Sequence, residues 1–302
     1  QLQAEQQIQE WKNKKSEPQQ QIKKFEVAQK ILNVTLNTTQ FNGLILYGEG
    51  GIGKTVLVVN AVKERFRPNE WEYSSGYTTA LSLYKFLYSN RDKKVIILDD
   101  MEGVWDNKKA ETLLKGTLWE VDGKRIVQYN STAEVAQDVP NAFIINAKIV
   151  ILANQLPKGK DVATKAMLTR TINYELNFSY AEKIEAISQF VKADKVLTEA
   201  QKHAVIKLIT EKTSEATDDM NFRTLRKAVA FVTGSQFFPE AETLFAATTT
   251  DNETVKAFLE AEKKSGIITE QVAYFNELIH KSRATFFRIK EKLIGKSQSI
   301  SV

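Results

Sequence analysis

Cysteine is absent from this chain of 302 residues, and histidine occurs only twice, as His203 and His280. The lack of cysteine excludes disulfides, zinc ribbons, iron–sulfur clusters and thiol nucleophiles. The shortage of histidine argues against a histidine-built metal centre and against a Ser-His-Asp triad. Any chemistry must therefore use carboxylates, lysine, arginine, backbone amides and a bound metal ion. A chain without cysteine also suits a reducing compartment, and we expect a cytoplasmic protein.

Proline (5 residues) and glycine (13 residues) are scarce as well, which favours long regular elements. No apolar run approaches the roughly 20 residues that span a bilayer, so we expect no membrane partner. Hydrophobic residues form 42% and charged residues 26% of the chain, a composition that excludes a disordered or fibrous protein. The length corresponds to about two domains. The net charge of +5 is a mild indication of a polyanionic partner.

A glycine-rich loop between a short apolar strand and a helix is the strongest motif in the chain. Residues 44–47 are an apolar strand, residues 48–55 read G-E-G-G-I-G-K-T, and a helical pattern continues to about residue 66. G-x-x-x-x-G-K-T in this strand–loop–helix context predicts a phosphate-binding loop, in which glycines let backbone N–H groups turn towards a phosphate chain. Lys54 would reach the β- and γ-phosphates, and the Thr55 hydroxyl would bind Mg²⁺. The predicted nucleotide-binding residues are Gly48, Glu49, Gly50, Gly51, Ile52, Gly53, Lys54, Thr55 and Val56.

A second apolar strand ends in acidic residues, as a nucleotide site requires. Residues 95–98 read V-I-I-L and run into Asp99 and Asp100, and Glu102 follows shortly after. Because this pattern describes a buried parallel strand with a carboxylate at its C-terminal edge, we expect Asp99 to bind Mg²⁺. Asp100 or Glu102 would polarise the attacking water, and the sequence leaves the choice between them open.

A third apolar strand, residues 148–153, ends in Asn154. The Asn154 amide would lie between the two motifs, where it could orient the water and sense the γ-phosphate. The alternative is an asparagine that only begins a turn before Pro157.

With these motifs in place, the chain resembles the AAA+ ATPases over about residues 40–235, and the resemblance implies ATP and Mg²⁺ as cofactors. Arg170 is similar to the arginine finger that reaches into a neighbouring subunit, and Arg223 is similar to the sensor-2 arginine of the lid; the alternative for each is a surface arginine. A finger needs a neighbour, so the resemblance implies a homo-oligomer, either a ring, with a hexamer as the first expectation, or a helical filament. One departure is Asp100, because many members of the family have glutamate at that position.

The expected fold class is α/β, with a P-loop NTPase αβα core around a parallel sheet, a small helical lid and a C-terminal all-α helix-turn-helix module. The expected domains are an N-terminal helical arm (1–40), the nucleotide-binding core (41–178), the lid (179–237) and the C-terminal module (238–302). Pro18 divides the arm into two helical pieces. These pieces either pack on the main domain or contact a neighbouring subunit.

A hairpin is expected between the acidic strand and the Asn154 strand. Residues 124–129 form a strand pattern that begins with Lys124 and Arg125, and a second apolar patch follows at residues 142–145. This layout is similar to superfamily 3 helicases, whose basic hairpin residues follow the backbone of a single DNA strand. Lys124 and Arg125 are therefore candidate DNA contacts, and the alternative is an exposed structural hairpin.

The last predicted helix has one apolar and one basic face. Ser282 would cap it, Thr269 would cap the preceding helix, and residues 286, 289 and 293 form an apolar stripe. The geometry is that of a helix-turn-helix, in which the second helix enters the major groove. A solvated basic face is the alternative. The candidate DNA contacts are Arg283, Thr285, Arg288 and Lys292.

Together these features predict an ATP-hydrolysing oligomeric AAA+ protein that acts on DNA as a replication initiator, helicase or helicase loader. An ATP-gated DNA-binding regulator without motor activity is a second hypothesis. A protein-remodelling AAA+ ATPase is a third.

Overall fold

The computed structural model describes residues 24–76, 79–100, 104, 107–129, 139–156 and 162–297. The chain divides into two compact units, of which the first is Gln1–Tyr47 with Lys54–Leu176 and the second is Gly48–Gly53 with Asn177–Val302. Pro18 and the first helical piece predicted for the arm lie outside the described residues.

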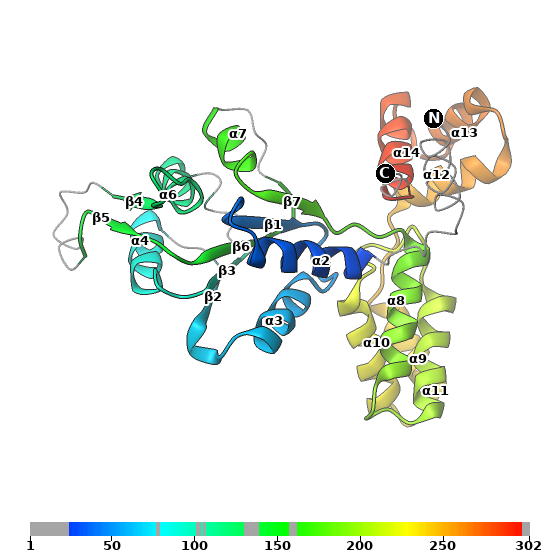
Figure 1. Ribbon diagram of the computed structural model, residues 1–302. Coiled ribbons are helices and arrows are strands. Elements are labelled where there is room, and N and C mark those ends of the chain that lie inside the picture. Colours follow the sequence, from blue (N-terminus) through cyan, green and yellow to red (C-terminus); the bar gives the residue numbers. More distant parts are fainter. Residues whose placement is uncertain are drawn as a thin grey trace, which may run out of the picture. The chain divides into compact units, whose positions relative to one another are not determined.

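The first unit is built on a five-stranded sheet in the order β2-β3-β6-β1-β7, and every neighbouring pair is parallel (Figure 1). β1, β3 and β6 lie at the centre and are almost wholly buried, as their uninterrupted apolar sequences predict. β7 lies at one edge, in agreement with its alternating pattern. The strands are β1 (Gly43–Tyr47), β2 (Trp71–Ser75), β3 (Val95–Asp99), β6 (Lys148–Ala153) and β7 (Ile172–Glu175).

The register of the central strands places three polar segments at one edge of the sheet. Tyr47, the last residue of β1, is level with Ala153 of β6. Asp99, the last residue of β3, is level with Leu152. The glycine-rich loop, the acidic strand end and Asn154 therefore leave the sheet side by side, at the edge where open parallel sheets bind ligands.

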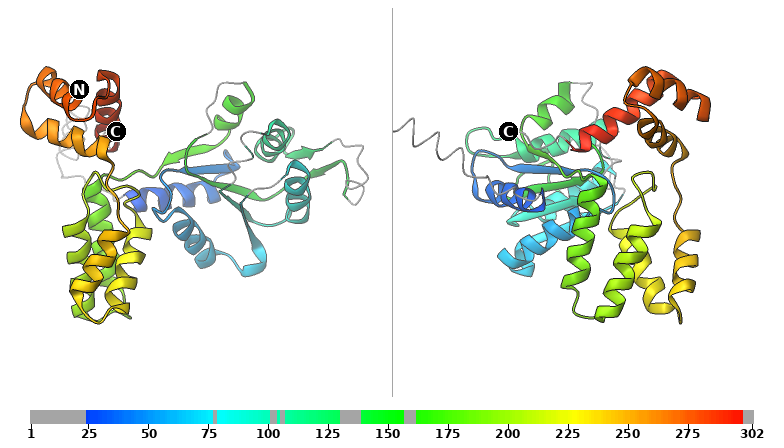
Figure 2. Two further views of the ribbon diagram at one scale, coloured as in Figure 1. Left: turned by 180° about the vertical axis from the view of Figure 1, so that it is seen from behind. Right: turned by 90° about the vertical axis from the view of Figure 1, so that its right-hand side faces the viewer.

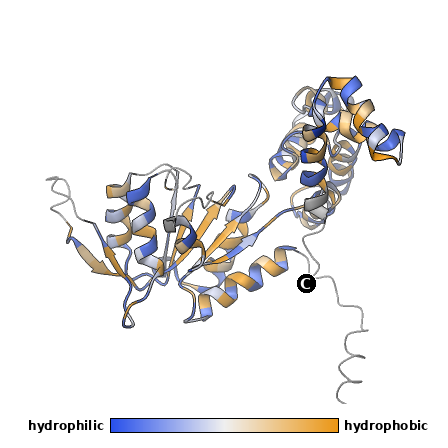
Figure 3. Ribbon diagram, turned by 90° about the horizontal axis from the view of Figure 1, so that it is seen from above, coloured by the Kyte–Doolittle hydropathy of each residue, from blue (hydrophilic) through white to orange (hydrophobic). Residues whose placement is uncertain are grey.

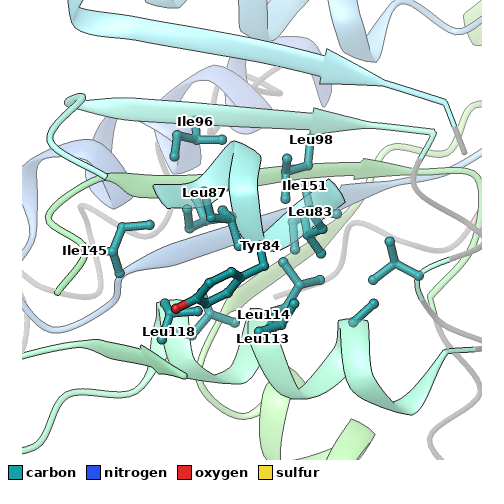
Figure 4. Packing of buried hydrophobic residues seen from close by; sticks show 14 of the residues in the cluster. Leu83, Tyr84, Leu87, Ile96, Leu98, Leu113, Leu114, Leu118, Ile145 and Ile151 are labelled. Atoms are coloured by element: carbon teal, nitrogen blue, oxygen red, sulfur yellow. The ribbon is translucent and has the colours of Figure 1, made fainter. Parts of the chain in front are cut away.

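Helices cover both faces of the sheet, which confirms the predicted αβα core. On one face, Leu87 of α4 and Leu114 of α6 pack against Ile96 and Ile151 of the central strands (Figure 4). Strand residues that alternate with these are also buried and point to the other face, where α2 contacts β1, β7 and α3. Figure 3 shows the apolar strands between helices of mixed hydropathy. The other elements of this unit are α2 (Lys24–Asn37), α3 (Lys54–Arg65), η1 (Pro68–Glu70), α4 (Ala80–Ser89), α6 (Lys108–Leu118) and α7 (Val162–Leu168).

The expected hairpin consists of β4 (Ile126–Gln128) and β5 (Ala142–Ile144), which pair antiparallel. Val127 and Phe143 lie opposite each other and are buried, and the Phe143 ring lies 5.1 Å from that of Tyr84 on α4. The neighbouring pair, Ile126 and Ile144, points to the other side and is exposed. The hairpin is thus anchored to the core through one face only.

The second unit contains a four-helix bundle with a core of its own in the region predicted as the lid, and we call it the lid bundle (Figure 2). α8 and α9 begin with capping boxes at Ser179 and Thr198. The last helix of the bundle starts at Phe238, where the sequence had placed the C-terminal module, but its Phe245 is fully buried in the lid core. The boundary predicted at residue 237 is therefore wrong, because it separates a helix from its own hydrophobic core. The lid helices are α8 (Tyr180–Ala193), α9 (Glu199–Lys212), α10 (Phe222–Gly234) and α11 (Phe238–Ala247).

Three further helices, α12 (Glu253–Lys264), α13 (Ile268–Ile279) and α14 (Arg283–Ser297), form a separate small cluster. Its centre is Phe286, whose ring lies 4.8 Å from that of Phe258 and 5.4 Å from that of Phe275. The predicted cap at Thr269 is wrong, because α13 begins one residue earlier and Ser265 accepts the Ile267 N–H at 3.0 Å. Within the described residues no helix is long and apolar enough to cross a membrane.

Candidate nucleotide site

The start of α3 brings four of the predicted site residues together at the C-terminal edge of the sheet. Lys54 is the first residue of α3 and is buried, and its Nζ lies 3.4 Å from Oδ1 of Asn154. The Thr55 hydroxyl donates to Oδ2 of Asp99 at 2.6 Å. These side chains surround a helix N-terminus, whose unpaired N–H groups and dipole favour an anion such as phosphate.

The oxygens of Thr55 and Asp99 fit a magnesium ion. Mg²⁺ takes oxygen ligands, and in nucleotide sites it is bound by one or two protein groups together with water and substrate phosphates. Thr55 Oγ1 and Asp99 Oδ2, 2.6 Å apart, form such a pair. Among the described residues, this site included, no group of three or more histidine and acidic side chains is placed to hold a metal ion. Protein, water and phosphate would thus share the coordination.

Tyr73 also belongs to this group, although it was not among the predicted site residues. β2 lies beside β3, and the Tyr73 hydroxyl donates to the same Oδ2 of Asp99 at 2.9 Å. Burial raises the pKa of Tyr73, and the hydrogen bond to Asp99 raises it further. The only sequence signal was a polar residue near the end of a strand, which becomes informative once β2 is known to neighbour the acidic strand.

Asp100 takes an unusual backbone conformation directly after β3. Its φ is +52°, in the left-handed region, and its side chain is exposed. Its N–H donates to Leu152 O at 3.2 Å, which holds the strand end in place. Aspartate is among the few residues that adopt this conformation readily. Glu102 lies outside the described residues, so the choice of base between Asp100 and Glu102 stays a prediction.

The glycines of the loop belong to the second unit and adopt conformations that require glycine. φ is +146° at Gly48, +74° at Gly51 and +91° at Gly53. Phe222 N–H donates to Gly51 O at 3.0 Å, so the start of α10 is hydrogen-bonded to the loop. A Cβ at Gly51 would lie 2.8 Å from Cγ of Asn221. Of the remaining predicted loop residues, Ile52 is buried and Val56 is exposed.

Arg223 lines a cavity of about 530 Å³ in the second unit, together with Glu49 and Gly50 of the loop. Glu49 forms an ion pair with Lys183 of α8, and both line the same cavity. The N–H of Arg223 donates to Oδ1 of Asn221 at 2.7 Å, which caps α10. The structure thus brings the predicted sensor-2 arginine close to the first half of the loop.

The Arg170 side chain contacts residues of its own chain. Its guanidinium lies 4.1 Å from the ring centre of Trp119, and it donates to Ala166 O at 2.5 Å. The Arg170 Nε is buried and finds no hydrogen-bond partner in the described part of the chain. The stacked arrangement is a cation–π contact. A role as a finger would require the side chain to leave Trp119, and it stays a prediction.

The structure separates the two basic residues proposed for the hairpin. Lys124 is exposed in the turn before β4. Arg125 is only 7% exposed and donates to two backbone carbonyls, Thr117 O at 2.8 Å and Ala147 O at 2.7 Å. Burial lowers its pKa. Arg125 as a DNA contact is therefore wrong for this structure, because its guanidinium is enclosed and already hydrogen-bonded.

The basic face predicted on the last helix is present on α14. Arg283, Arg288 and Lys292 are exposed and Thr285 is half-buried. Ser282 Oγ accepts the Thr285 N–H at 3.3 Å, which is the predicted cap. α13 ends at Ile279, and its C-cap residue His280 has a left-handed conformation. Only residues 280–282 therefore separate α13 from α14. Lys292 also lines the cavity described above.

The parallel sheet order, the glycine-rich loop after β1 and the acidic end of β3 define a P-loop α/β core, and a helical C-terminal region follows it in the chain. The chain matches no protein-family model. An uncharacterized 36.7 kDa protein of Enterobacteria phage T4, from the nrdC–mobD intergenic region, is 24% identical over 172 residues, which cover 54% of this chain and 53% of that protein. The chain thus spans about half the length of the curated relative it matches.

Solved structures of two kinds are similar to this chain. The RuvB Holliday junction branch migration motor of Thermotoga maritima is 15% identical with a TM-score of 0.47, and the match covers 87% of this chain and 86% of that one. The replication initiator DnaA bound to AMPPCP and single-stranded DNA is 13% identical with a TM-score of 0.46, and the match covers 90% and 86%.

Proposed function

We propose that this protein is an oligomeric AAA+ ATPase that hydrolyses ATP and acts on DNA as a replication initiator, helicase or helicase loader. The observation that carries the ATPase proposal is the convergence of Lys54, Thr55, Asp99 and Asn154 at the C-terminal edge of the sheet. These are the residue types needed to bind a triphosphate, to hold Mg²⁺ and to orient a water.

In this proposal each residue has a separate task. Lys54 neutralises charge on the β- and γ-phosphates, and Thr55 and Asp99 hold Mg²⁺. The bound metal would supply charge neutralisation at the transferring phosphoryl group. Asn154 orients the attacking water, and Asp100 or Glu102 accepts its proton. Arg223 stabilises charge on the γ-phosphate.

The oligomer is a ring, with a hexamer as the first expectation, or a helical filament, and Arg170 acts in a neighbouring site. Mixing Arg170→Ala subunits with Lys54→Ala subunits tests this directly. Assemblies that contain both should recover hydrolysis, because some sites then combine an intact Lys54 with an intact Arg170. If mixed assemblies stay as inactive as each variant alone, the trans role of Arg170 is refuted.

The DNA part of the proposal rests on α14. Three exposed cations and Thr285 lie on a capped helix that follows a short turn, which is the arrangement that helix-turn-helix proteins insert into the major groove. Exposed Lys124 remains a candidate contact for a single strand. The lack of cysteine is compatible with a cytoplasmic location, which we propose as well.

The experiment that tests the function is ATP hydrolysis and strand displacement on a forked duplex, with Lys54→Ala as the inactive control. Hydrolysis with strand displacement, both lost in Lys54→Ala, supports a motor. Hydrolysis with duplex binding but no displacement under any nucleotide supports the ATP-gated regulator. Hydrolysis without any salt-dependent DNA binding supports the protein-remodelling alternative. A wild-type chain that neither binds nor hydrolyses ATP refutes the proposal.

A further inference from the structure

Oδ2 of Asp99 accepts two hydrogen bonds from two different elements. Thr55, in the first turn of α3, donates at 2.6 Å, and Tyr73, on β2, donates at 2.9 Å. Asp99 itself is only 6% exposed. The carboxylate therefore joins the start of α3 to the neighbouring strand β2 through two hydrogen bonds.

Two donors on one carboxylate oxygen fix its rotation about the Cβ–Cγ bond. Of these donors, Thr55 is itself an expected ligand of the metal, so its hydroxyl would present its oxygen to the ion. Tyr73 would still donate to Asp99, because its ring is carried by β2, which is held to β3 along five register pairs from Trp71 to Ser75. Groups that hold a metal ligand in this way typically change metal affinity or activity by 10–100-fold when they are removed.

We propose that Tyr73 is a positioning residue for the metal site: its hydroxyl holds the Asp99 carboxylate in the orientation that binds the divalent cation of the nucleotide complex. This inference rests on the proposed ATPase function and adds to it a residue on β2. Packing alone does not explain the hydroxyl, because phenylalanine would fill the same volume on this half-buried strand.

The test compares Tyr73→Phe with Tyr84→Phe. Tyr84 of α4 is a matched control because its hydroxyl also donates a hydrogen bond inside the first unit, to Pro140 O and not to Asp99. Mn²⁺ serves as the probe and is titrated into the full chain with a non-hydrolysable ATP analogue, and the bound ion is measured by water-proton relaxation. Binding of a fluorescent ATP analogue in EDTA measures nucleotide affinity without metal.

Tyr73→Phe should weaken Mn²⁺ binding by about 10-fold or more, with metal-free nucleotide binding unchanged and with Tyr84→Phe like the wild type. In hydrolysis, the Mg²⁺ concentration at half-maximal rate should rise by a similar factor, while the rate at saturating Mg²⁺ changes little. Tyr73→Leu also removes the hydroxyl and is the second variant if Tyr73→Phe does not fold.

Unchanged Mn²⁺ affinity in folded Tyr73→Phe, or an equal loss in Tyr84→Phe, overturns the positioning role while leaving the ATPase proposal intact. A wild-type chain that binds no nucleotide in EDTA and no Mn²⁺ with the analogue refutes the proposed function, and the role of Tyr73 is refuted with it.

Discussion

Replacing Arg125 by methionine should destabilise the first unit without affecting DNA binding. The Arg125 guanidinium connects the C-terminal end of α6, through Thr117 O, to the segment before β6, through Ala147 O. Methionine keeps an unbranched apolar stem like that of arginine, but it lacks the guanidinium and provides no donor for either carbonyl. Both carbonyls belong to buried residues.

The size of the effect follows from two opposing contributions. A hydrogen bond from a charged donor contributes about 1.5–3 kcal/mol, and a buried carbonyl left without a donor costs about 1–3 kcal/mol. Removing the guanidinium also removes the penalty of burying a charge, which offsets part of this loss. We expect the free energy of unfolding to fall by about 2–4 kcal/mol.

The assay is denaturant unfolding followed by tryptophan fluorescence. Trp71 and Trp119, the tryptophans among the described residues, lie in the first unit, so their fluorescence reports its unfolding. Lys124→Met is the matched control: it removes a neighbouring exposed cation and should change stability by less than about 0.5 kcal/mol. If Arg125→Met is as stable as the wild type but binds single-stranded DNA more weakly, the structural assignment is refuted and a DNA contact is favoured.

Three further predictions concern the second unit. Gly51→Ala should lower the free energy of unfolding of the second unit by at least about 1–2 kcal/mol, because alanine is strained at φ +74°. Adding Asn221→Gly to this variant should restore only the part of the loss that comes from the contact with Asn221. Urea titrations followed by circular dichroism measure both effects. Phe286→Ala should destabilise the C-terminal helices by about 3–5 kcal/mol, because it removes the centre of their core. Duplex binding should be abolished while ATP hydrolysis persists. Hydrogen exchange should show the loss of stability in α12, α13 and α14. The backbone N–H groups of Leu197 and Val196 donate to Asp194 and lower its pKa below 3.8. The contribution of Asp194 to stability is therefore present above pH 3.8 and lost as the pH falls through the folded-state pKa. Asp194→Asn should lack this dependence when unfolding is measured from about pH 6 to about pH 2.

Each of these three predictions would be contradicted by a specific result. Equal stability of Gly51→Ala and wild type would show that the loop can relax around a side chain. Duplex binding by Phe286→Ala would place the DNA contact outside α14. The same acid dependence in Asp194→Asn would assign that dependence to other carboxylates.

The sequence predicted those parts of the fold that depend on local patterns. The apolar runs of β3 and β6 end in the expected polar residues, and the cap at Ser282 is where the sequence predicted it. Periodicity and turn chemistry act over a few residues, so one sequence is enough to read them.

Features that depend on the order of strands or on the depth of burial could not be read in this way. Tyr73 acquires its partner only because β2 lies beside β3 in the sheet. Arg125 looks in sequence like a basic residue in an exposed hairpin, and its burial depends on α6 and on the segment before β6. The helix that begins at Phe238 carries Phe245, which is buried in one cluster with Ile187 of α8 and Leu208 of α9, far from it in sequence.

Gly51 bears on how the phosphate-loop motif is compared between proteins. In G-x-x-x-x-G-K-T the third and fourth positions are written as free, yet here Gly51 faces Asn221, the residue that caps α10. A larger residue at position 51 therefore requires a smaller residue at position 221 and a loop that leaves its left-handed conformation. In relatives that keep this packing, positions 51 and 221 should therefore change together. A variable position of the phosphate-loop motif would then correlate with the residue that caps α10.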